Sequence, residues 1–240
     1  MEVKKLLVTG VEKLDLSINS EQIEKFLDYI DILLKWNEKV NLTAIDDPQD
    51  VVVKHFLDSI SCATVIDLKP GDKVMDIGTG AGFPGIPLKI LYPEIELSLL
   101  DSRNKRINFL KSLSRELDLD NIEFIHGRAE DYGQNPEYRE NFDYVFARAV
   151  AALNILNEYT IPFLKHRGSF ISQKGSEVKK EVAEALSSIE ILGAEFYDII
   201  PIELPYTAAE RNLVIINKVR ETPKHYPRQA GVPKQDPISG

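Results

Sequence analysis

A glycine-rich turn is the first feature of the chain whose residue types suggest chemistry. It runs Asp76-Ile77-Gly78-Thr79-Gly80-Ala81-Gly82, with a short apolar stretch before it and Pro84 after it. Glycines let the backbone turn sharply and approach a ligand closely, and proline suits the first turn of a helix. The pattern therefore predicts a strand, a turn that cradles a cofactor, and a helix.

Two cofactors are compatible with this turn. Gly80, Gly82 and Gly85 satisfy the dinucleotide fingerprint G-x-G-x-x-G, and Asp101 follows at about the 20-residue distance that the fingerprint requires. A carboxylate just before the first glycine suits a cofactor with a cationic sulfonium and an amino group, and suits a pyrophosphate poorly. Asp76 thus favours S-adenosylmethionine, with a nicotinamide-dependent oxidoreductase as the alternative.

Further polar residues follow the next predicted strands. Asp101 ends the second strand, where its carboxylate can accept hydrogen bonds from both ribose hydroxyls of an adenosine. Ala129 and Glu130 follow the third strand, where the adenine would lie. Arg148 ends the fourth, where it would hold a substrate base or phosphate, brace the cofactor site, or form an ion pair with a nearby carboxylate. Neither a Ser-His-Asp order nor a metal cluster is evident, so we expect neither hydrolysis nor a bound metal.

Alternating elements place these residues along one sheet edge. Short apolar runs predict strands at 73–77, 96–100, 122–126, 142–148 and 169–173, and helical periodicity predicts helices at 84–92, 103–117, 152–164 and 177–192. Two late strands, 195–202 and 212–219, have only a loop between them and should form an antiparallel hairpin. This order predicts an α/β fold of the class I methyltransferase type, Rossmann-like, with a mostly parallel seven-stranded sheet.

Additional segments flank this predicted methyltransferase domain of residues 67–220. Apolar spacing predicts helices at 20–39 and 51–65, so residues 1–66 form an N-terminal helical extension. Residues 221–240 are locally basic and rich in proline, which predicts an extended tail.

Composition narrows the class of protein. A single cysteine, Cys62, excludes an intrachain disulfide, and no apolar run of signal-peptide or membrane-spanning length is present, so we expect a cytoplasmic protein without a membrane partner. The formal net charge of -9 argues against a nucleic-acid partner unless basic side chains gather on one surface.

Several segments together resemble one family. They are Asp76 to Gly85, Asp101-Ser102-Arg103-Asn104-Lys105-Arg106, Ala147-Arg148-Ala149, Trp36-Asn37, Asn41-Leu42-Thr43, His55-Phe56-Leu57-Asp58-Ser59 and Tyr226-Pro227-Arg228. The chain resembles, over nearly its whole length, the ribosomal small-subunit methyltransferase G family, also called glucose-inhibited division protein B. The resemblance implies N7-methylation of guanine 527 of 16S ribosomal RNA, with S-adenosylmethionine as donor. It also implies cofactor contacts at Gly78, Phe83, Ala129, Glu130 and Arg148, in addition to Gly80 and Asp101 inferred above.

The implied reaction needs no catalytic base, because guanine N7 has a free lone pair and no proton to lose. Direct in-line attack then depends on holding N7 and the methyl group about 3 Å apart. We expect basic side chains to bind phosphates of the 16S rRNA or small ribosomal subunit, namely Arg103, Lys105, Arg106, Lys224 and Arg228. The expected state is a monomer, and a non-catalytic RNA-binding ribosome-assembly protein remains a further alternative.

Overall fold

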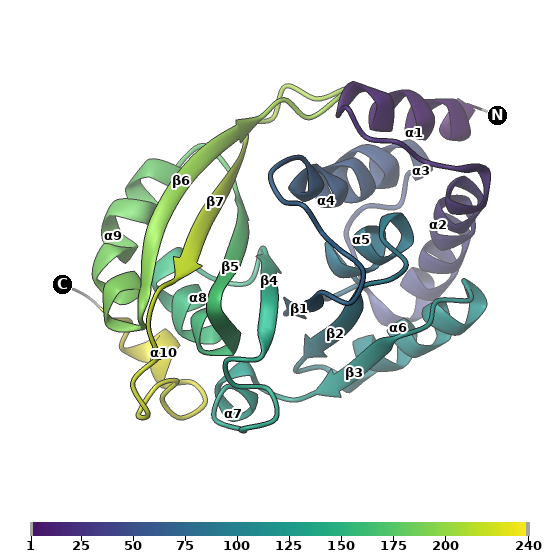
Figure 1. Ribbon diagram of the computed structural model, residues 1–240. Coiled ribbons are helices and arrows are strands. Elements are labelled where there is room, and N and C mark those ends of the chain that lie inside the picture. Colours follow the sequence, from purple (N-terminus) through teal and green to yellow (C-terminus); the bar gives the residue numbers. More distant parts are fainter. Residues whose placement is uncertain (1, 239–240) are drawn as a thin grey trace.

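A mixed sheet of seven strands organises the chain in the computed structural model, which describes residues 2–238 (Figure 1). The strand order is β3-β2-β1-β4-β5-β7-β6. The strands are β1 Lys73–Ile77, β2 Glu96–Asp101, β3 Ile122–His126, β4 Phe142–Arg148, β5 Leu164–Lys174, β6 Ala194–Ile202 and β7 Arg211–Lys218. The first five are parallel, and β7 pairs antiparallel with both β5 and β6. The predicted sheet and its final hairpin are confirmed.

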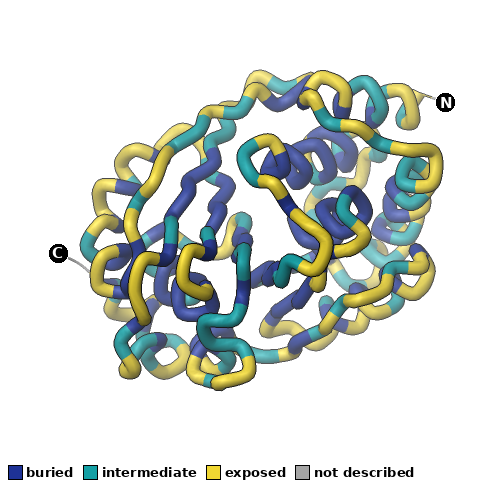
Figure 2. The backbone as a smooth tube through the Cα atoms, viewed as in Figure 1, coloured by how far each residue is buried: buried dark blue, intermediate teal, exposed yellow. Residues whose placement is uncertain are grey.

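Helices cover both faces of the sheet. The helices within this region are α5 Gly85–Leu91, α6 Asn104–Glu116, α7 Ala129–Tyr132, α8 Leu153–Thr160 and α9 Val178–Ile191. Alternate residues of each buried strand point to opposite faces. Val74 therefore joins the core under α5 and α6, and Met75 joins the core under α8 and α9. Figure 2 shows much of the central strands in the buried colour, and residues 81–91, which end the glycine turn and form α5, are all buried.

The N-terminal helices pack on the α5 and α6 side of the sheet. They are α1 Glu2–Lys13, α2 Ser20–Val40, α3 Pro48–Val51 and α4 Asp58–Ile60, with a π-helical stretch Val52–Leu57 and a 3-10 turn Ser61–Thr64. The sequence predicted α2 but no helix at α1, and it predicted one helix where α3, the π-helical stretch and α4 follow one another. Among residues 2–238, no helix is both long and apolar enough to span a bilayer.

One predicted helix end and the predicted conformation of the tail were wrong, each for an identifiable reason. The helix expected to reach residue 164 ends at Thr160, because Pro162 has no amide hydrogen for an α-helical bond; a 3-10 turn follows and β5 begins at Leu164. The tail was expected to be extended throughout, but it contains a short helix, α10 Val232–Gln235. Pro233 lies in its first turn, where no amide donor is needed.

Candidate functional site

The glycine turn connects β1 to α5 at the carboxyl edge of the sheet, where ligands bind in open α/β folds. Gly78 and Gly80 have positive φ angles of 70° and 61°, a conformation that side chains disfavour. A Cβ on Gly78 would lie 2.6 Å from Val150 Cγ2, whereas a Cβ on Gly80 would meet only the Gly78 carbonyl at 3.9 Å. Gly80 therefore presents bare backbone to open space, as close approach of a cofactor requires.

Asp76 joins the two ends of the glycine turn, a role that the sequence did not suggest. Its side chain is fully buried, and Oδ2 accepts hydrogen bonds from Thr79 Oγ1 at 2.7 Å and from the Gly85 amide at 2.9 Å. Burial raises the pKa of Asp76 to about 6. One carboxylate oxygen thus ties the two ends of the turn together. The other, Oδ1, is buried without a hydrogen-bond partner among the described residues.

Asp101 joins β2 to the same turn. Its carboxylate is 2% exposed; Oδ2 accepts from the Gly80 amide at 3.0 Å and from Arg106 Nη1 at 3.1 Å, and Oδ1 accepts from the Arg103 amide at 2.8 Å. A carboxylate oxygen has two lone pairs, so Oδ1 keeps one for a ligand hydroxyl. The Arg106 guanidinium is held beside the turn, while the Arg103 and Lys105 side chains are exposed on the neighbouring rim.

Ala129 and Glu130 begin α7, directly after β3, and both are buried. Glu130 Oε1 accepts a hydrogen bond from the Gly231 amide of the tail at 2.8 Å. This contact links the predicted adenine side of the site to residues about 100 positions later in the chain.

Arg148, at the end of β4, is held by an ion pair with Asp58. Its Nη1 lies 2.8 Å from Asp58 Oδ2, and its guanidinium lies 5.0 Å above the centre of the Phe83 ring. Asp58 Oδ1 accepts a hydrogen bond from a second guanidinium, that of Arg211, whose Nε lies 3.0 Å away. One buried carboxylate therefore orients two arginines that come from β4 and β7.

His55 completes this cluster as a neutral ring. Its Nδ1 lies 3.2 Å from Arg148 Nη2, which only donates, so Nδ1 accepts and the ring hydrogen sits on Nε2, 2.8 Å from Thr43 Oγ1. Burial, and secondly the charge of Arg148, lower the pKa of His55 to about 3. The ring also stacks on Phe83, with centroids 4.4 Å apart. His55 is thus a positioning group and not a base near neutral pH.

A hollow of about 450 Å³ opens beside this cluster. Four basic side chains contribute to its wall: Lys54, Arg148, Lys174 and Arg211. Asp58 and Glu181 supply two negative charges, so the wall carries an excess of positive charge within an acidic protein. Such a wall suits an anionic or electron-rich ligand such as a nucleotide.

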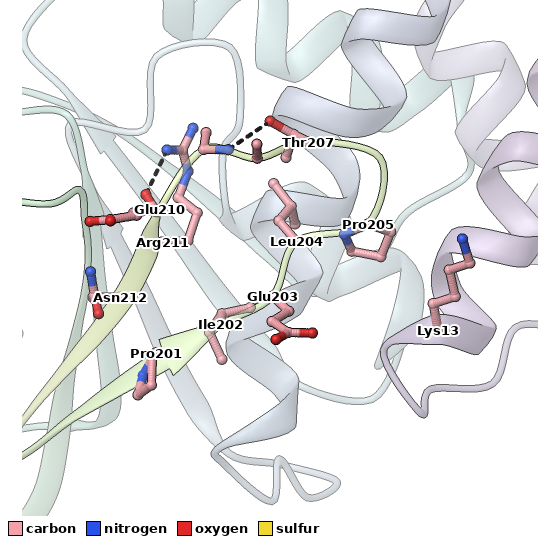
Figure 3. Close-up of a pocket in the computed structure, with 12 residues that line it drawn as sticks. Lys13, Pro201, Ile202, Glu203, Leu204, Pro205, Thr207, Glu210, Arg211 and Asn212 are labelled. Carbon is pink, nitrogen blue, oxygen red and sulfur yellow. Dashed lines mark hydrogen bonds between the residues drawn. The ribbon is translucent and has the colours of Figure 1, made fainter.

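A larger hollow, of about 710 Å³, lies between Lys13 of α1 and the loop that joins β6 to β7 (Figure 3). Prolines, aliphatic groups and backbone form most of its wall, and no residue of the glycine turn lines it. Arg211 borders both hollows. Size alone therefore does not mark the cofactor site. Among residues 2–238, no group of three or more His, Cys, Asp or Glu side chains is arranged to hold a metal ion.

Comparison with known proteins decides the family. The sequence profile described as rRNA small subunit methyltransferase G matches residues 22–214. The chain belongs to this family. Curated relatives with the name ribosomal RNA small subunit methyltransferase G include one from Alkaliphilus oremlandii, 49% identical over 99% of this chain and 100% of its own. Another, from Lactococcus lactis subsp. cremoris, is 47% identical over 96% of this chain and 97% of its own.

A solved structure supports the fold class. A SAM-dependent methyltransferase from Aquifex aeolicus superposes with a TM-score of 0.53, at 17% identity, over 75% of this chain and 97% of its own. Both the family resemblance and the methyltransferase fold predicted from the sequence are thus confirmed.

Sequence reasoning did not assign a role to the groups that surround Arg148, which are His55, Asp58 and Arg211. His55 and Asp58 were noted only as part of a family-like segment, although their three-residue spacing places them on one helical face. Arg211 carried no signal, because its partner Asp58 is 153 positions away. Only folding brings these groups together.

The tail residues expected to bind RNA are in unlike environments. Lys224 is exposed, but the Arg228 guanidinium forms a forked pair with the buried carboxylate of Glu158, with Nη2 and Oε2 2.7 Å apart. The Arg228 side chain is 23% exposed and is held by this pair, so it is not a free cation on the surface.

Proposed function

We propose that this chain transfers the methyl group of S-adenosylmethionine to a guanine of 16S rRNA, and that the atom modified is N7 of guanine 527. Membership of the rRNA small subunit methyltransferase G family, with relatives matched over nearly their whole length, carries this proposal. We further propose that it acts in the cytoplasm, where the ribosomal subunits that it would modify are assembled. We also propose that it acts as a monomer.

The residues of the glycine turn fit such a cofactor. The bare backbone at Gly80 permits close approach, and the unpaired, buried Oδ1 of Asp76 favours a cationic ligand over a pyrophosphate. This argues against the nicotinamide alternative. Gly78 and Gly80 would hold the cofactor from the turn, Asp101 would accept from its ribose, and Ala129 and Glu130 would border its adenine. When bound, S-adenosylmethionine supplies an electrophilic methyl group.

Arg148 would connect the cofactor to the substrate base. It faces Phe83 on one side and the hollow of about 450 Å³ on the other. A guanidinium plane offers stacking and hydrogen bonds to a guanine whose base has been turned out of its stack. Because N7 needs no deprotonation, the task of the protein is alignment, which can lower a barrier by about 7–11 kcal/mol.

Exposed basic side chains near the carboxyl edge would bind the RNA backbone. Arg103 and Lys105 follow β2, Arg128 follows β3, and Lys54 lies beside Arg148. These side chains place positive charge around the cofactor site of a chain whose net charge is -9. Each phosphate contact adds about 0.7–0.9 to the salt dependence of binding.

Transfer of a labelled methyl group tests the proposal. Purified protein is incubated with labelled S-adenosylmethionine in two parallel reactions. One contains 16S rRNA and the other contains small ribosomal subunits, both from cells that lack this protein. We expect label in the RNA. Cleavage of the RNA at 7-methylguanine with borohydride and aniline, followed by primer extension, should place the modified base at guanine 527. Affinity for NAD without affinity for S-adenosylmethionine would instead favour the oxidoreductase, and RNA binding without transfer would favour the non-catalytic assembly protein.

A further inference from the structure

The C-terminal tail, residues 222–238, packs against α7 and α8 and is not a free arm (Figure 1). Arg139 donates hydrogen bonds to the carbonyls of Thr222 at 2.7 Å and Tyr226 at 2.7 Å, and Gln134 donates to the carbonyl of Pro227 at 2.7 Å. Pro233 and Ile238 are buried. The tail is therefore an integral part of the folded domain.

Arg228 fixes the position of the tail on α8. Its backbone amide and Nε both donate to Glu158 Oε1, at 2.7 and 3.0 Å, and its Nη2 donates to Oε2 at 2.7 Å. Glu158 is 1% exposed, and a carboxylate so deeply buried requires a charged partner. Nη2 also donates to the Asp236 carbonyl at 2.8 Å, so the same guanidinium holds the segment on either side of residues 229–235.

The fixed segment reaches the proposed cofactor site at Gly231. Its amide donates to Glu130 Oε1 at 2.8 Å, and Glu130 is 4% exposed. Gly231 has a positive φ angle of 91°, a backbone conformation that side chains disfavour. With Oε1 fixed, the second oxygen of Glu130 is restricted to a narrow range of positions.

We propose that the tail is a positioning element of the cofactor site, in which the Gly231 amide holds Glu130 in the orientation that binds the adenine side of S-adenosylmethionine. This inference rests on the proposed function, because it takes Glu130 as a cofactor contact. It assigns Arg228 to this scaffold and not to the RNA surface. The tail then contributes to cofactor affinity and not mainly to RNA affinity.

Gly231→Ala tests the contact while keeping both side chains of the buried Arg228–Glu158 pair. A Cβ at this position would meet only Gln235 Nε2, at 4.0 Å, so the change adds backbone strain and little collision. Gly71→Ala is the matched control: Gly71 also has a positive φ, of 80°, lies before β1 at the opposite edge, and has nothing within 4 Å of its Cβ position. Calorimetric titration with S-adenosylmethionine should show about tenfold weaker binding for Gly231→Ala, about 1.4 kcal/mol, and wild-type binding for Gly71→Ala.

Hydrogen exchange gives an independent readout. Coupling between two sites is reciprocal, so saturation with S-adenosylmethionine should slow exchange of the amides at 229–232 in the wild type. Arg228→Gln should weaken cofactor binding more than Arg228→Lys, and Lys234→Gln, which removes an exposed tail charge, should not weaken it.

Equal cofactor affinities for Gly231→Ala and Gly71→Ala would overturn the inference, and so would hydrogen exchange of the tail amides that does not change when the cofactor binds. The tail would then only stabilise the fold. A loss of RNA binding alone in the Arg228 variants would overturn it in favour of an RNA-binding arm. Failure of the wild type to bind S-adenosylmethionine would refute the proposed function itself, and so is distinguishable from both.

Discussion

The substitution Asp58→Asn tests whether one carboxylate controls the geometry of the substrate side of the site. Asp58 accepts from Arg148 at 2.8 Å and from Arg211 at 3.0 Å, and its side chain is 6% exposed. Asparagine has nearly the same shape but no charge, and its amide can present an acceptor to only one of the two arginines. The other guanidinium then faces an N–H group.

The magnitude follows from the burial of each partner. Breaking a buried ion pair typically costs about 3–5 kcal/mol. The Arg211 side chain is 30% exposed, so its pair contributes about 1 kcal/mol or less, and Arg148 keeps its contacts with the Lys54 carbonyl and His55. We therefore expect a loss of about 2–3 kcal/mol in the free energy of unfolding, equivalent to a fall of about 4–12 °C in Tm.

Methyl transfer to rRNA should fall further than stability alone explains. A displacement of about 1 Å in a positioning group can cost about 100-fold in rate, and that is the loss we expect in kcat/KM for RNA at a temperature where the variant is folded. Asp50→Asn is the matched control, because Asp50 pairs with Lys54 at the surface with its side chain 47% exposed. If Asp58→Asn melts within about 1 °C of Asp50→Asn and methylates RNA at the wild-type rate, the two arginines do not depend on Asp58.

Three further predictions concern neighbouring groups. Folding lowers the pKa of His55 to about 3, so as the pH falls below about 6.5 the His55 ring is protonated in the unfolded chain but not in the folded one. The free energy of unfolding of the wild type should therefore fall by up to about 1.4 kcal/mol per pH unit relative to that of His55→Gln. Parallel pH profiles of the two proteins in urea unfolding from pH 7 to 5 would contradict this. Gly80→Ala should weaken S-adenosylmethionine binding at least about tenfold with only about 1–2 kcal/mol of strain, and unchanged calorimetric affinity would place the cofactor elsewhere. Lys105→Gln should lower the salt slope of RNA binding by about 0.7–0.9, whereas Arg106→Gln should leave it nearly unchanged because Asp101 holds the Arg106 side chain. Slopes lowered equally in both variants would show that Arg106 also reaches RNA, and a slope unchanged in Lys105→Gln would show that Lys105 does not.

Local patterns were sufficient for most of the fold. The five parallel strands and the final hairpin were predicted because short apolar runs, helical periods and turn residues are all local signals. The missed helix α1 also carried such a signal, since Val3, Leu6, Leu7 and Val11 lie on one helical face. The π-helical stretch at Val52–Leu57 had no local marker, and it places His55 within reach of Arg148.

The site was predictable only as far as strand ends define it. The carboxyl ends of parallel strands meet at one edge, so the chain positions of Asp101 and Arg148 implied a shared crevice. The partners of these residues were not implied. Asp58 meets Arg148 across 90 positions, and Glu158 meets Arg228 across 70, and no periodicity connects such distant residues. The interior role of Asp76 was missed for a different reason: its partners Thr79 and Gly85 are near in sequence, but they reach the carboxylate only when the turn closes.

The two long-range contacts explain how a glycine-rich edge can be rigid enough to align a reaction. Glycine turns permit close approach but supply no side chains to orient the polar groups around them. Freezing a long side chain such as Arg148 or Glu130 costs up to about 1.5–2 kcal/mol, and a ligand that had to do so on binding would bind more weakly. Here segments outside the parallel sheet fix these side chains before a ligand binds: Asp58 of the N-terminal helices holds Arg148, and Gly231 of the tail holds Glu130. The N-terminal helices and the tail lie at opposite sides of the molecule in Figure 1. With Arg148 and Glu130 in their proposed roles, each segment preorganises a different part of one site, and we expect substitutions in either to alter activity without touching the glycine turn.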